Sequence, residues 1–529
     1  MASELKKRKN IKIIMIVISL LLIVSGIIGA YIFYKAKNKP KKDTENNTET
    51  VKYSSKYKMN SNSLEDFDLY FLKEENNSKN MVYSPISLKN ALSMLSEAAE
   101  GNSKGQIDAV LGDYKLKKYT NSANVSFANS FFIRDTYKDS IKENFIKTLK
   151  EKYGAEVIYD SFKDPTNINN WVSQKTFNLI NNLLDSVSEQ DFYLINALAI
   201  NMEWKNLIQP TIVSNSNGIK YDYENQDFYG WNVHYPHENY WVSVDLLGED
   251  IYPSINFENN IKASAVKLAA SANRYDIVNV LGESYIRKIV NEEYDRYLSE
   301  DMCGFTEAER QNIINNYMED IDKGYKKVAS STDFRFYVDS DIKVFAKELK
   351  EYDGLNLEYI GIMPESLSLS DYIKNINAEK LNETISNLKS IELKSFEDGY
   401  ITRVTGSIPL FKFDYSLDAL SDIKSLGIND IFDPSKANLN NMNNESYINE
   451  VVHKSSIEFS NEGIKAAAAT GGGGAGDISC DFEYLFNVPV KDIDLTFDKP
   501  YLFLIRDKDT NEVWFMGSVY NPTINNIND

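Results

Sequence analysis

The 529-residue chain contains few of the side chains that usually carry enzymatic or metal chemistry. It has three histidines, and two of them, His234 and His237, lie close to Glu238 in an aromatic-rich stretch. That order differs from HExxH, in which two histidines one helical turn apart bind zinc and the glutamate acts as the base. The two cysteines, Cys303 and Cys480, are too few for a disulfide scaffold or a cysteine-ligated zinc module, and we expect free thiols. Because no nucleophile–histidine–acid set is recognisable either, we expect no cofactor, no metal and no enzymatic activity.

The charge of the chain is divided unevenly along its length. The formal net charge is −19 and the pI is about 4.9, which argues against a nucleic-acid partner because phosphates attract Lys and Arg. Residues 1–42 alone carry +9, so the rest of the chain carries −28. Within the basic end, residues 13–34 form an uncharged run of 22 residues, IIMIVISLLLIVSGIIGAYIFY.

That apolar run is long enough to cross a bilayer, which takes about 20 residues. The main alternative is a cleavable signal peptide, but its apolar core is usually about 7–15 residues, and the small-residue site around Ala30 is poor. We therefore expect a cytoplasmic stub over residues 1–12, a transmembrane helix over 13–34 and a solvated tether over 35–62. Both flanks of the run are basic, so the positive-inside rule discriminates weakly. We favour a single-pass cell-membrane protein with an extracellular body.

The body begins near Ser63 and mixes strands with segregated helices, which predicts an α+β fold. Ser84 and Pro85 have the types expected at the start of a helix, where a hydroxyl caps and proline fits the first turn. The nearly uniform apolar run FYLINALAINMEW predicts a strand that is buried on both faces. The remaining expected elements are a strand at 81–83, a strand in VSFANSFFIRD, a helix ending at Gly154, a helix through INNWVSQKTFNLINNLL, and a hairpin whose turn covers 507–511.

Several of these segments resemble the serpin family. They are MVYSPISLKNALSML, FANSFFI, INNWVSQKT, LINALAINMEWK, IPLFKFDYSLDALSDIKSLGINDIF, HKSSIEFSNEGIKAAAAT and DKPYLFLIRD…FMGSVYNP, which occur in serpin order and cover most of residues 63–525. The resemblance implies three β-sheets, about nine helices and an exposed reactive loop near the C-terminus. It also implies an inhibitor of serine (or cysteine) proteases, which is cleaved in the loop, forms an acyl-enzyme and inserts the cut loop as a new strand of the main sheet.

Segment 462–476 resembles the serpin hinge, although its Ala and Gly residues alone would also suit a flexible linker. Asn461 and Ile464 depart from the family pattern, and the glycines cost strand stability, so we expect partial substrate behaviour. The hinge residues implied by the resemblance are Glu462, Gly463, Ile464, Ala466, Ala467, Ala468, Ala469 and Thr470. Alternate residues of an inserting strand are buried, and those counted from Ile464 are uncharged: Ile464, Ala466, Ala468, Thr470, Gly472 and Gly474.

The scissile bond is harder to locate because the loop is longer than in an antitrypsin-like serpin. The family's usual spacing from Gly463 gives Asp477–Ile478, which would select a protease with a basic pocket. Counting back from the strand motif at Pro500 places the scissile bond near Pro489 instead. Candidates between these positions, Phe482, Tyr484, Leu485 and Phe486, would select chymotrypsin-like or subtilisin-like enzymes.

The resemblance also implies structural roles for other residues of this sequence. Trp204 matches the tryptophan near the entry point of the loop, called the breach. The polar cluster beneath the main sheet, called the shutter, is matched by Ser84, Ser87, Asn196 and His453. Each has a plainer interpretation, since Trp204 could be a core aromatic and His453 a hydrogen-bonded core histidine.

Residues 206–332 do not fit the family length, and we interpret them as an inserted subdomain of unreadable function within a serpin domain of residues 63–525. The partners we expect are a target protease and the membrane, with a monomeric chain and no nucleic acid. A non-inhibitory serpin-like binding or sensor protein is the alternative function. The Asn-, Lys- and Ile-rich, cysteine-poor composition suggests a bacterial source with AT-rich DNA.

Overall fold

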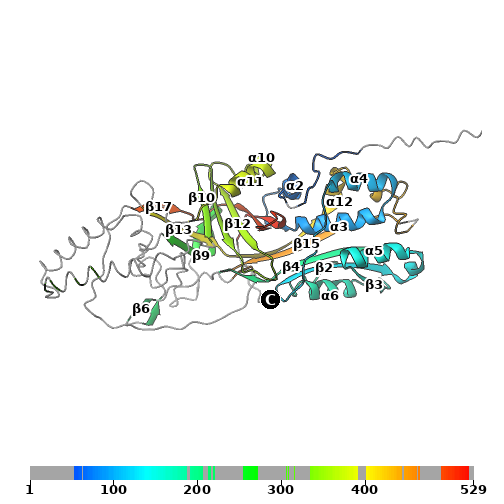
Figure 1. The fold of residues 1–529 in the computed structure, drawn as a ribbon, viewed down its shortest axis with the longest axis horizontal. Coiled ribbons are helices and arrows are strands. Elements are labelled where there is room, and N and C mark those ends of the chain that lie inside the picture. The colour runs from blue at the N-terminus through cyan, green and yellow to red at the C-terminus, as the bar shows by residue number, and fades with distance from the viewer. Residues whose placement is uncertain are drawn as a thin grey trace, which may run out of the picture. The chain divides into compact units, whose positions relative to one another are not determined.

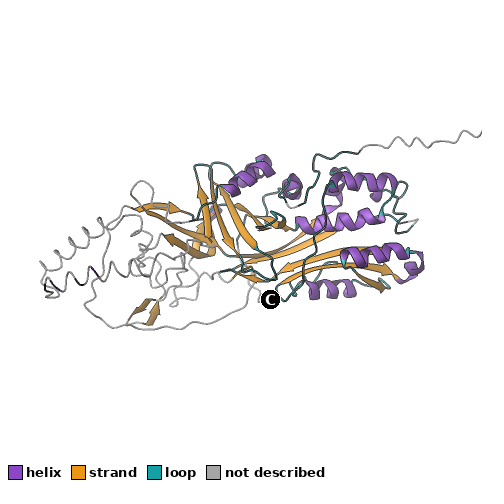
Figure 2. Cartoon of the chain, in the orientation of Figure 1, coloured by secondary structure: helices purple, strands orange, loops and turns teal. Residues whose placement is uncertain are grey.

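The computed structural model describes most of the expected body. The described residues are 53–61, 63–187, 191–205, 213–215, 218–220, 254–271, 334–390, 401–443, 446–460, 463–464 and 490–522, with the single positions Thr306, Ala308, Asn312 and Asn315. They fold into the strands and helices that Figures 1 and 2 show.

The main sheet is built from two groups of strands that share one chain segment. Strands β3, β2 and β4 form one group, and β14, β15, β16 and β5 form the other; β4 and β5 are consecutive and separated only by Asn201. The bounds are β2 (Val125–Arg134), β3 (Glu156–Asp160), β4 (Phe192–Ile200), β5 (Met202–Glu203), β14 (Phe411–Asp418), β15 (Val452–Phe459) and β16 (Gly463–Ile464).

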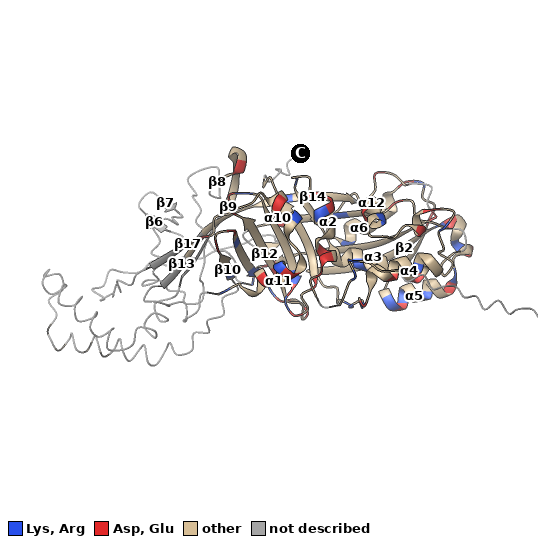
Figure 3. Cartoon of the chain, turned by 90° about the horizontal axis from the view of Figure 1, so that it is seen from above, with Lys and Arg blue, Asp and Glu red and all other residues tan. Residues whose placement is uncertain are grey.

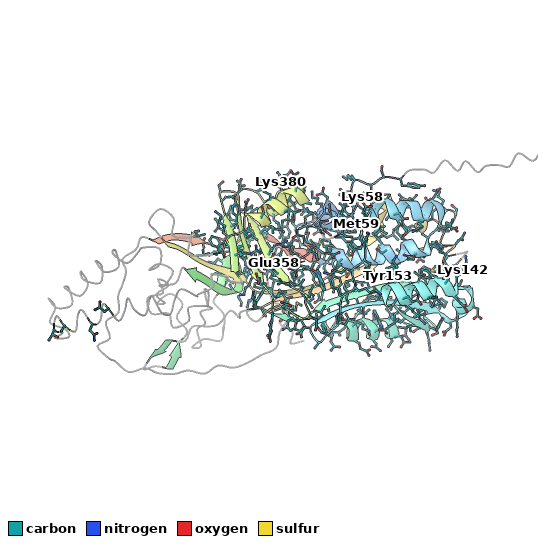
Figure 4. The ribbon with its side chains drawn as sticks, viewed as in Figure 1. Lys58, Met59, Lys142, Tyr153, Glu358 and Lys380 are labelled. Carbon is teal, nitrogen blue, oxygen red and sulfur yellow. The ribbon has the colours of Figure 1, made fainter. Side chains whose placement is uncertain are left out.

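A six-stranded sheet carries much of the hydrophobic core, in the order β1, β19, β18, β12, β11, β10. Glu358 of β12, labelled in Figure 4, is fully buried and forms ion pairs with Arg335 and Arg506, whose Nε donates to Glu358 Oε1 at 2.8 Å. Two guanidinium groups compensate the cost of burying this carboxylate. The bounds are β1 (Met81–Tyr83), β10 (Phe334–Val338), β11 (Ile342–Glu348), β12 (Leu357–Pro364), β18 (Tyr501–Asp507) and β19 (Val513–Val519).

A four-stranded sheet has the order β17, β13, β9, β8. Its β17–β13 pair is parallel, whereas β13–β9 and β9–β8 are antiparallel. The bounds are β8 (Ser254–Phe257), β9 (Ile261–Ser271), β13 (Ile401–Pro409) and β17 (Val490–Asp494); a separate two-stranded sheet contains β6 (Val213–Asn215) and β7 (Gly218–Lys220). Residues 254–271, which lie inside the expected insertion 206–332, therefore belong to a sheet that also contains β13 and β17.

Helices cover both faces of the main sheet. Helix α3 contacts β4 on one face, and α6 packs on the other through a cluster that includes Phe132, Trp171 and Ile195. Basic and acidic residues both occur on α5 and α11, as Figure 3 shows. The helix bounds are α2 (Asp66–Glu74), α3 (Pro85–Ala98), α4 (Gly101–Leu111), α5 (Glu143–Tyr153), α6 (Thr166–Lys175), α10 (Leu369–Asn375), α11 (Ala378–Ser386) and α12 (Ala419–Ser425), with short 3₁₀ turns η1 (Asp135–Ser140), η2 (Glu258–Asn260) and η4 (Asp430–Phe432).

Most of the predicted elements are confirmed. Ser84 caps α3 by accepting a hydrogen bond from Ser87 N, and Pro85 is the first helical residue. Helix α5 ends at Gly154 in the left-handed conformation, and β18 and β19 form the predicted hairpin. The α+β class and the several sheets are also as expected.

The predicted helix through residue 184 is wrong in its second half, because α6 ends at Lys175. Phe177 and Asn178 have positive φ angles of 53° and 61°, which an α-helix does not accommodate. The Thr176 hydroxyl bonds back to Val172 O, so a polar side chain completes the last turn. Periodicity alone missed this stop because Leu179 and Leu183 continue the apolar spacing beyond it.

Several predictions fall outside the described residues. The expected transmembrane helix over 13–34 and the stub over 1–12 are among them, as are His234, His237, Cys303 and Cys480. In the described part of the chain, no helix has the length and apolarity needed to span a membrane. Within the same residues, no group of three or more His, Cys, Asp or Glu side chains is placed to hold a metal ion.

Candidate functional site: a slot in the main sheet

The two halves of the main sheet are joined by the very short strand β16. Ile464 pairs with Met202 of β5 on one side and with Phe459 of β15 on the other, both antiparallel, and Gly463 pairs with Glu203. In the described chain, no ladder joins β4 directly to β15. The sheet is therefore closed at the end where β16 lies and open along β4 and β15.

A tight turn holds β16 at this position. Ser460 N donates to Gly463 O at 3.1 Å, and Gly463 N donates to the Ser460 hydroxyl at 3.2 Å. The indole Nε1 of Trp204 donates to Ser460 O at 2.9 Å, and the side chain of Trp204 is buried. Trp204 thus fixes the reversal of the chain that brings Gly463 and Ile464 into the sheet.

Gly463 is required by close packing at this turn. A Cβ on residue 463 would lie 2.7 Å from Glu203 Cα and still closer to the Met202 carbonyl oxygen. Both obstacles are backbone atoms, which cannot rotate away as a side chain can. Strand β16 can therefore lie between β5 and β15 only when residue 463 is glycine.

A cavity of about 100 Å³ occupies the opening between β4 and β15, and α3 forms its floor. A smaller cavity of about 20 Å³ lies toward β16, and Ile180 and Leu198 line both. We call these two neighbouring cavities together the slot. Most of its lining is apolar, but the part over the N-terminus of α3 is polar and contains Ser84, Ser87, Asn196 and His453.

His453, which is half-buried, is the centre of the polar part. Its Nε2 accepts a hydrogen bond from Ser84 N at 3.0 Å, and the Ser455 hydroxyl lies 3.2 Å from the same nitrogen. Burial lowers the pKa of His453 to about 4 because the charged ring would lose its hydration. The ring is consequently neutral near pH 7, with Nε2 as acceptor and the proton on Nδ1.

Asn196 lies on β4, across the slot from His453. Its Nδ2 donates to Asn129 Oδ1 at 2.9 Å, while its Oδ1 is buried and has no hydrogen-bond partner among the described residues. A buried amide oxygen without a donor is unusual, because nearly all such groups are satisfied in folded proteins.

The structure brings together part of the expected site. Ser84, Ser87, Asn196 and His453 line one cavity, and Trp204 contacts the turn that leads into β16. The described hinge residues are Gly463 and Ile464, whereas Glu462, Ala466, Ala467, Ala468, Ala469, Thr470 and the proposed scissile pair Asp477 and Ile478 lie outside the described residues.

Two contributing residues were not identified from the sequence. Ser455 contacts the His453 ring, and its position two residues away on the same strand places it on the same face, which strand periodicity could have indicated. Ser460 forms the turn before β16, and only the tertiary contact with Trp204 marks it as important.

Comparison with known proteins identifies the family. The profile described as "Serpin (serine protease inhibitor)" matches residues 66–216 and 311–522, which is more than half of the chain. The chain therefore belongs to the serpin family.

Curated relatives agree over part of their length. The chain is 32% identical to leukocyte elastase inhibitor A of Mus musculus over 207 residues, covering 38% of this chain and 49% of the relative. It is 33% identical to Serpin B10 of Otolemur garnettii over 191 residues, covering 34% of this chain and 43% of the relative. These alignments thus span less than half of each relative. Both relatives are mammalian, and the expectation of a bacterial source stays a prediction.

Solved structures agree with the fold. The native state of tengpin, a thermophilic serpin, has a TM-score of 0.54 at 20% identity, covering 86% of this chain and 92% of tengpin. Thyroxine-binding globulin in complex with thyroxine has a TM-score of 0.54 at 16% identity, covering 86% and 97%. At these identities the likeness establishes the serpin fold and nothing about ligands.

Proposed function

We propose that the chain is a suicide-substrate inhibitor of serine proteases. In this proposal a protease attacks the loop between β16 and β17, forms an acyl-enzyme, and is trapped when the cut loop enters the slot as a new strand. The observation that carries the proposal is β16 itself, since Ile464 already pairs with both Met202 and Phe459 at the head of the slot.

The sequence after β16 suits this role. The next alternate residues, Ala466 and Ala468, are small and uncharged, so they can be buried against the floor of the slot. Lys465 falls on the opposite alternation and can keep its charge in water. Insertion would also satisfy backbone groups along the edges of β4 and β15 that no ladder pairs within the part of the chain that the structure describes.

The target is proposed from the loop and from relatives. Four curated relatives carry the name leukocyte elastase inhibitor or leukocyte elastase inhibitor A, which favours a serine protease as the partner. We propose Asp477–Ile478 as the bond that is cut, with Phe482, Tyr484, Leu485 and Phe486 as alternatives.

We also propose that residues 13–34 anchor the chain in the cell membrane with the body outside. Recovery of the chain in the membrane fraction, and its accessibility to added protease on whole cells, would test this.

Mixing the full chain with a panel of serine and cysteine proteases tests the inhibitory function. We expect a complex that survives boiling in detergent, and mass spectrometry of the released C-terminal peptide identifies the bond. Thr470→Arg should convert the inhibitor into a substrate, because a charge would have to enter the buried alternation. Lys465→Arg is the matched control, since it keeps the charge on the solvent face and should leave complex formation unchanged.

Two outcomes would count against the proposal. Cleaved chain without covalent complex, at every ratio and with every protease, would favour the non-inhibitory binding or sensor function. Unchanged complex formation by Thr470→Arg would refute insertion of this segment.

A further inference from the structure

The first described residues of the body, 53–61, are packed against it. Tyr57 is half-buried and Met59 is fully buried, whereas Lys56 and Lys58 are exposed. This alternation is typical of an extended segment that lays one face on the protein. Figure 4 labels Lys58 and Met59 in this segment. We call residues 53–61 the strap.

Backbone hydrogen bonds fasten the strap to the end of α4. Met59 N donates to Val110 O at 2.9 Å, and Asp113 N donates to Met59 O at 3.2 Å. The first bond satisfies one of the last carbonyls of the helix, which have no partner within it. Lys58 also forms an ion pair with Asp113 at 2.9 Å, but both groups are exposed and water weakens it. The buried Met59 and its two backbone bonds therefore hold the strap.

Two glycines make room for the strap on α4. A Cβ on Gly105, inside the helix, would lie 2.8 Å from the ring of Tyr53. A Cβ on Gly112, just after the helix, would lie 2.6 Å from Met59 O. Glycine inside a helix lowers its stability relative to alanine. The ring that covers Gly105 gives a reason for glycine at that position.

The strap carries the chain from one part of the body to another. Just after it, Leu64 lies beside α11, because Asn382 Nδ2 donates to Leu64 O at 3.3 Å. Tyr53 at its start lies on α4, and the six residues from there to Met59 correspond to about 20 Å of extended chain. The tether expected over 35–62 therefore ends at residue 52, and it joins the body at α4 and not at α11.

Helix α4 lies at the end of the main sheet that is remote from β16. Ala419 N of α12 donates to Val451 O, just before β15 begins, at 3.2 Å. The turn after α12 reaches α4, where Gln106 Oε1 accepts a hydrogen bond from Asn429 N at 2.8 Å. The eight residues of β15 then span about 25 Å to β16. Figures 1 and 3 both show α4 and β17 toward opposite ends of the described body.

We propose that the strap fixes which end of the body faces the membrane, so that the anchored chain presents its reactive loop away from the bilayer. This inference rests on the proposed anchor at residues 13–34. The 18 residues 35–52 reach at most about 65 Å, and they join the body at α4. The described ends of the loop, Ile464 and Val490, belong to β16 and β17 at the other end. A protease in the medium therefore reaches the loop without lying against lipid.

Energy transfer from the body to the membrane measures this orientation. The full chain with Cys303→Ser and Cys480→Ser is placed in phosphatidylcholine nanodiscs that contain a rhodamine-labelled lipid. A donor dye is attached at one of two exposed positions, Asn102→Cys on α4 or Glu351→Cys in the turn after β11, whose backbone bonds to β5. We expect higher transfer from Asn102→Cys than from Glu351→Cys, because α4 is the end that the tether holds.

Undocking the strap should remove that difference. Met59→Asp places a carboxylate where the side chain is fully buried, so the strap should leave α4 and the tether should start near α11. Gly105→Gln displaces the ring of Tyr53 and also removes a glycine from α4, so it tests the same docking without weakening the helix. Lys58→Ala is the matched control, since it removes only an exposed ion pair and should keep the difference. Near-UV circular dichroism checks that each variant is folded.

The outcomes separate the orientation from the anchor. Equal transfer from both positions, or higher transfer from Glu351→Cys, in chains that co-purify with the nanodiscs would overturn the orientation and leave the anchor standing. A difference that survives in folded Met59→Asp and Gly105→Gln would overturn the role of the strap. Chains that do not co-purify with nanodiscs would overturn the anchor and the orientation together, and covalent trapping of proteases in solution would still stand.

Discussion

The indole Nε1 of Trp204 donates a 2.9 Å hydrogen bond to the carbonyl oxygen of Ser460, 256 residues further along the chain. This contact ties the end of β5 to the turn that follows β15, and so fixes the two sides between which β16 lies. Because the bond comes from a buried side chain, it is shielded from competing water. Trp204 therefore links the start of the loop to the slot that the loop is proposed to fill.

Replacing Trp204 by Phe should weaken this end of the sheet. The substitution removes the donor to Ser460 O and keeps aromatic packing against Tyr359 and Phe459, whose ring centroids lie 6.2 and 5.5 Å away. We expect a loss of about 0.5–1.5 kcal/mol in the free energy of unfolding, since the half-buried Ser460 carbonyl loses the indole donor. Urea titration measures the loss, and protease titration measures the fraction that forms complex, which should fall.

Trp171→Phe is the matched control for that experiment. The Trp171 indole also donates a hydrogen bond, to Glu156 Oε2 at 3.0 Å, but it lies in the cluster beneath α6. Trp171→Phe should lower the free energy of unfolding without changing the fraction of the chain that forms a complex with protease. Equal effects of both variants on that fraction would refute a specific role for Trp204.

Gly463→Ala should displace β16. The new Cβ would lie 2.7 Å from Glu203 Cα and closer to the Met202 carbonyl, and backbone atoms of β5 would have to move. We expect a cost of about 1–3 kcal/mol, as for other overpacked sites, and more cleaved chain per complex formed. Gly154→Ala is the control, because Gly154 has a φ of 61° with no atom near its missing Cβ, so alanine strains the backbone without touching the slot.

Stability should depend on the protonation of His453. Its pKa is about 4 in the folded chain, because the ring is buried, against about 6.5 in the unfolded chain. Between these values the unfolded chain binds more protons, so the free energy of unfolding falls as the pH is lowered through 6.5 toward 4. The contribution of His453 amounts to about 2 kcal/mol between pH 7 and pH 5.

His453→Gln tests this dependence by urea titration at both pH values. Glutamine offers an acceptor to Ser84 N but does not titrate, so the difference between pH 7 and pH 5 should shrink by about 2 kcal/mol relative to the wild type. An unchanged difference would show that His453 does not titrate in this range.

The buried ion pair between Lys89 of α3 and Asp68 of α2 should be essential to packing beneath the sheets. Both side chains are fully buried, and Lys89 Nζ lies 2.6 Å from Asp68 Oδ1. Burial raises the pKa of Asp68, although Lys89 opposes the shift. Lys89→Met would leave the carboxyl buried without its cation, and we expect a loss of about 3–5 kcal/mol. Adding Asp68→Asn should restore part of it; a double variant as unstable as Lys89→Met would contradict the charge argument.

Much of the fold could be predicted from local sequence. Ser84 and Pro85 determined the start of α3, and Gly154 the end of α5, because capping and backbone conformation depend on neighbouring residues only. The same local reasoning failed after Lys175, where left-handed residues end α6 in spite of continuing apolar spacing. The spacing of apolar residues indicates which face of an element is buried, but it does not indicate every position at which a helix ends.

The sequence by itself determined the alternation of small, uncharged residues after Gly463 and the candidate polar positions Asn196 and His453, through residue types and family order. Tertiary structure decided what those positions do together. It placed Ile464 between Met202 and Phe459, left β4 and β15 without a ladder between them in the described chain, and brought Asn196 and His453 to the lining of one cavity. The physical reason is that register belongs to pairs of strands, which come here from segments some 250 residues apart, and no local pattern specifies it.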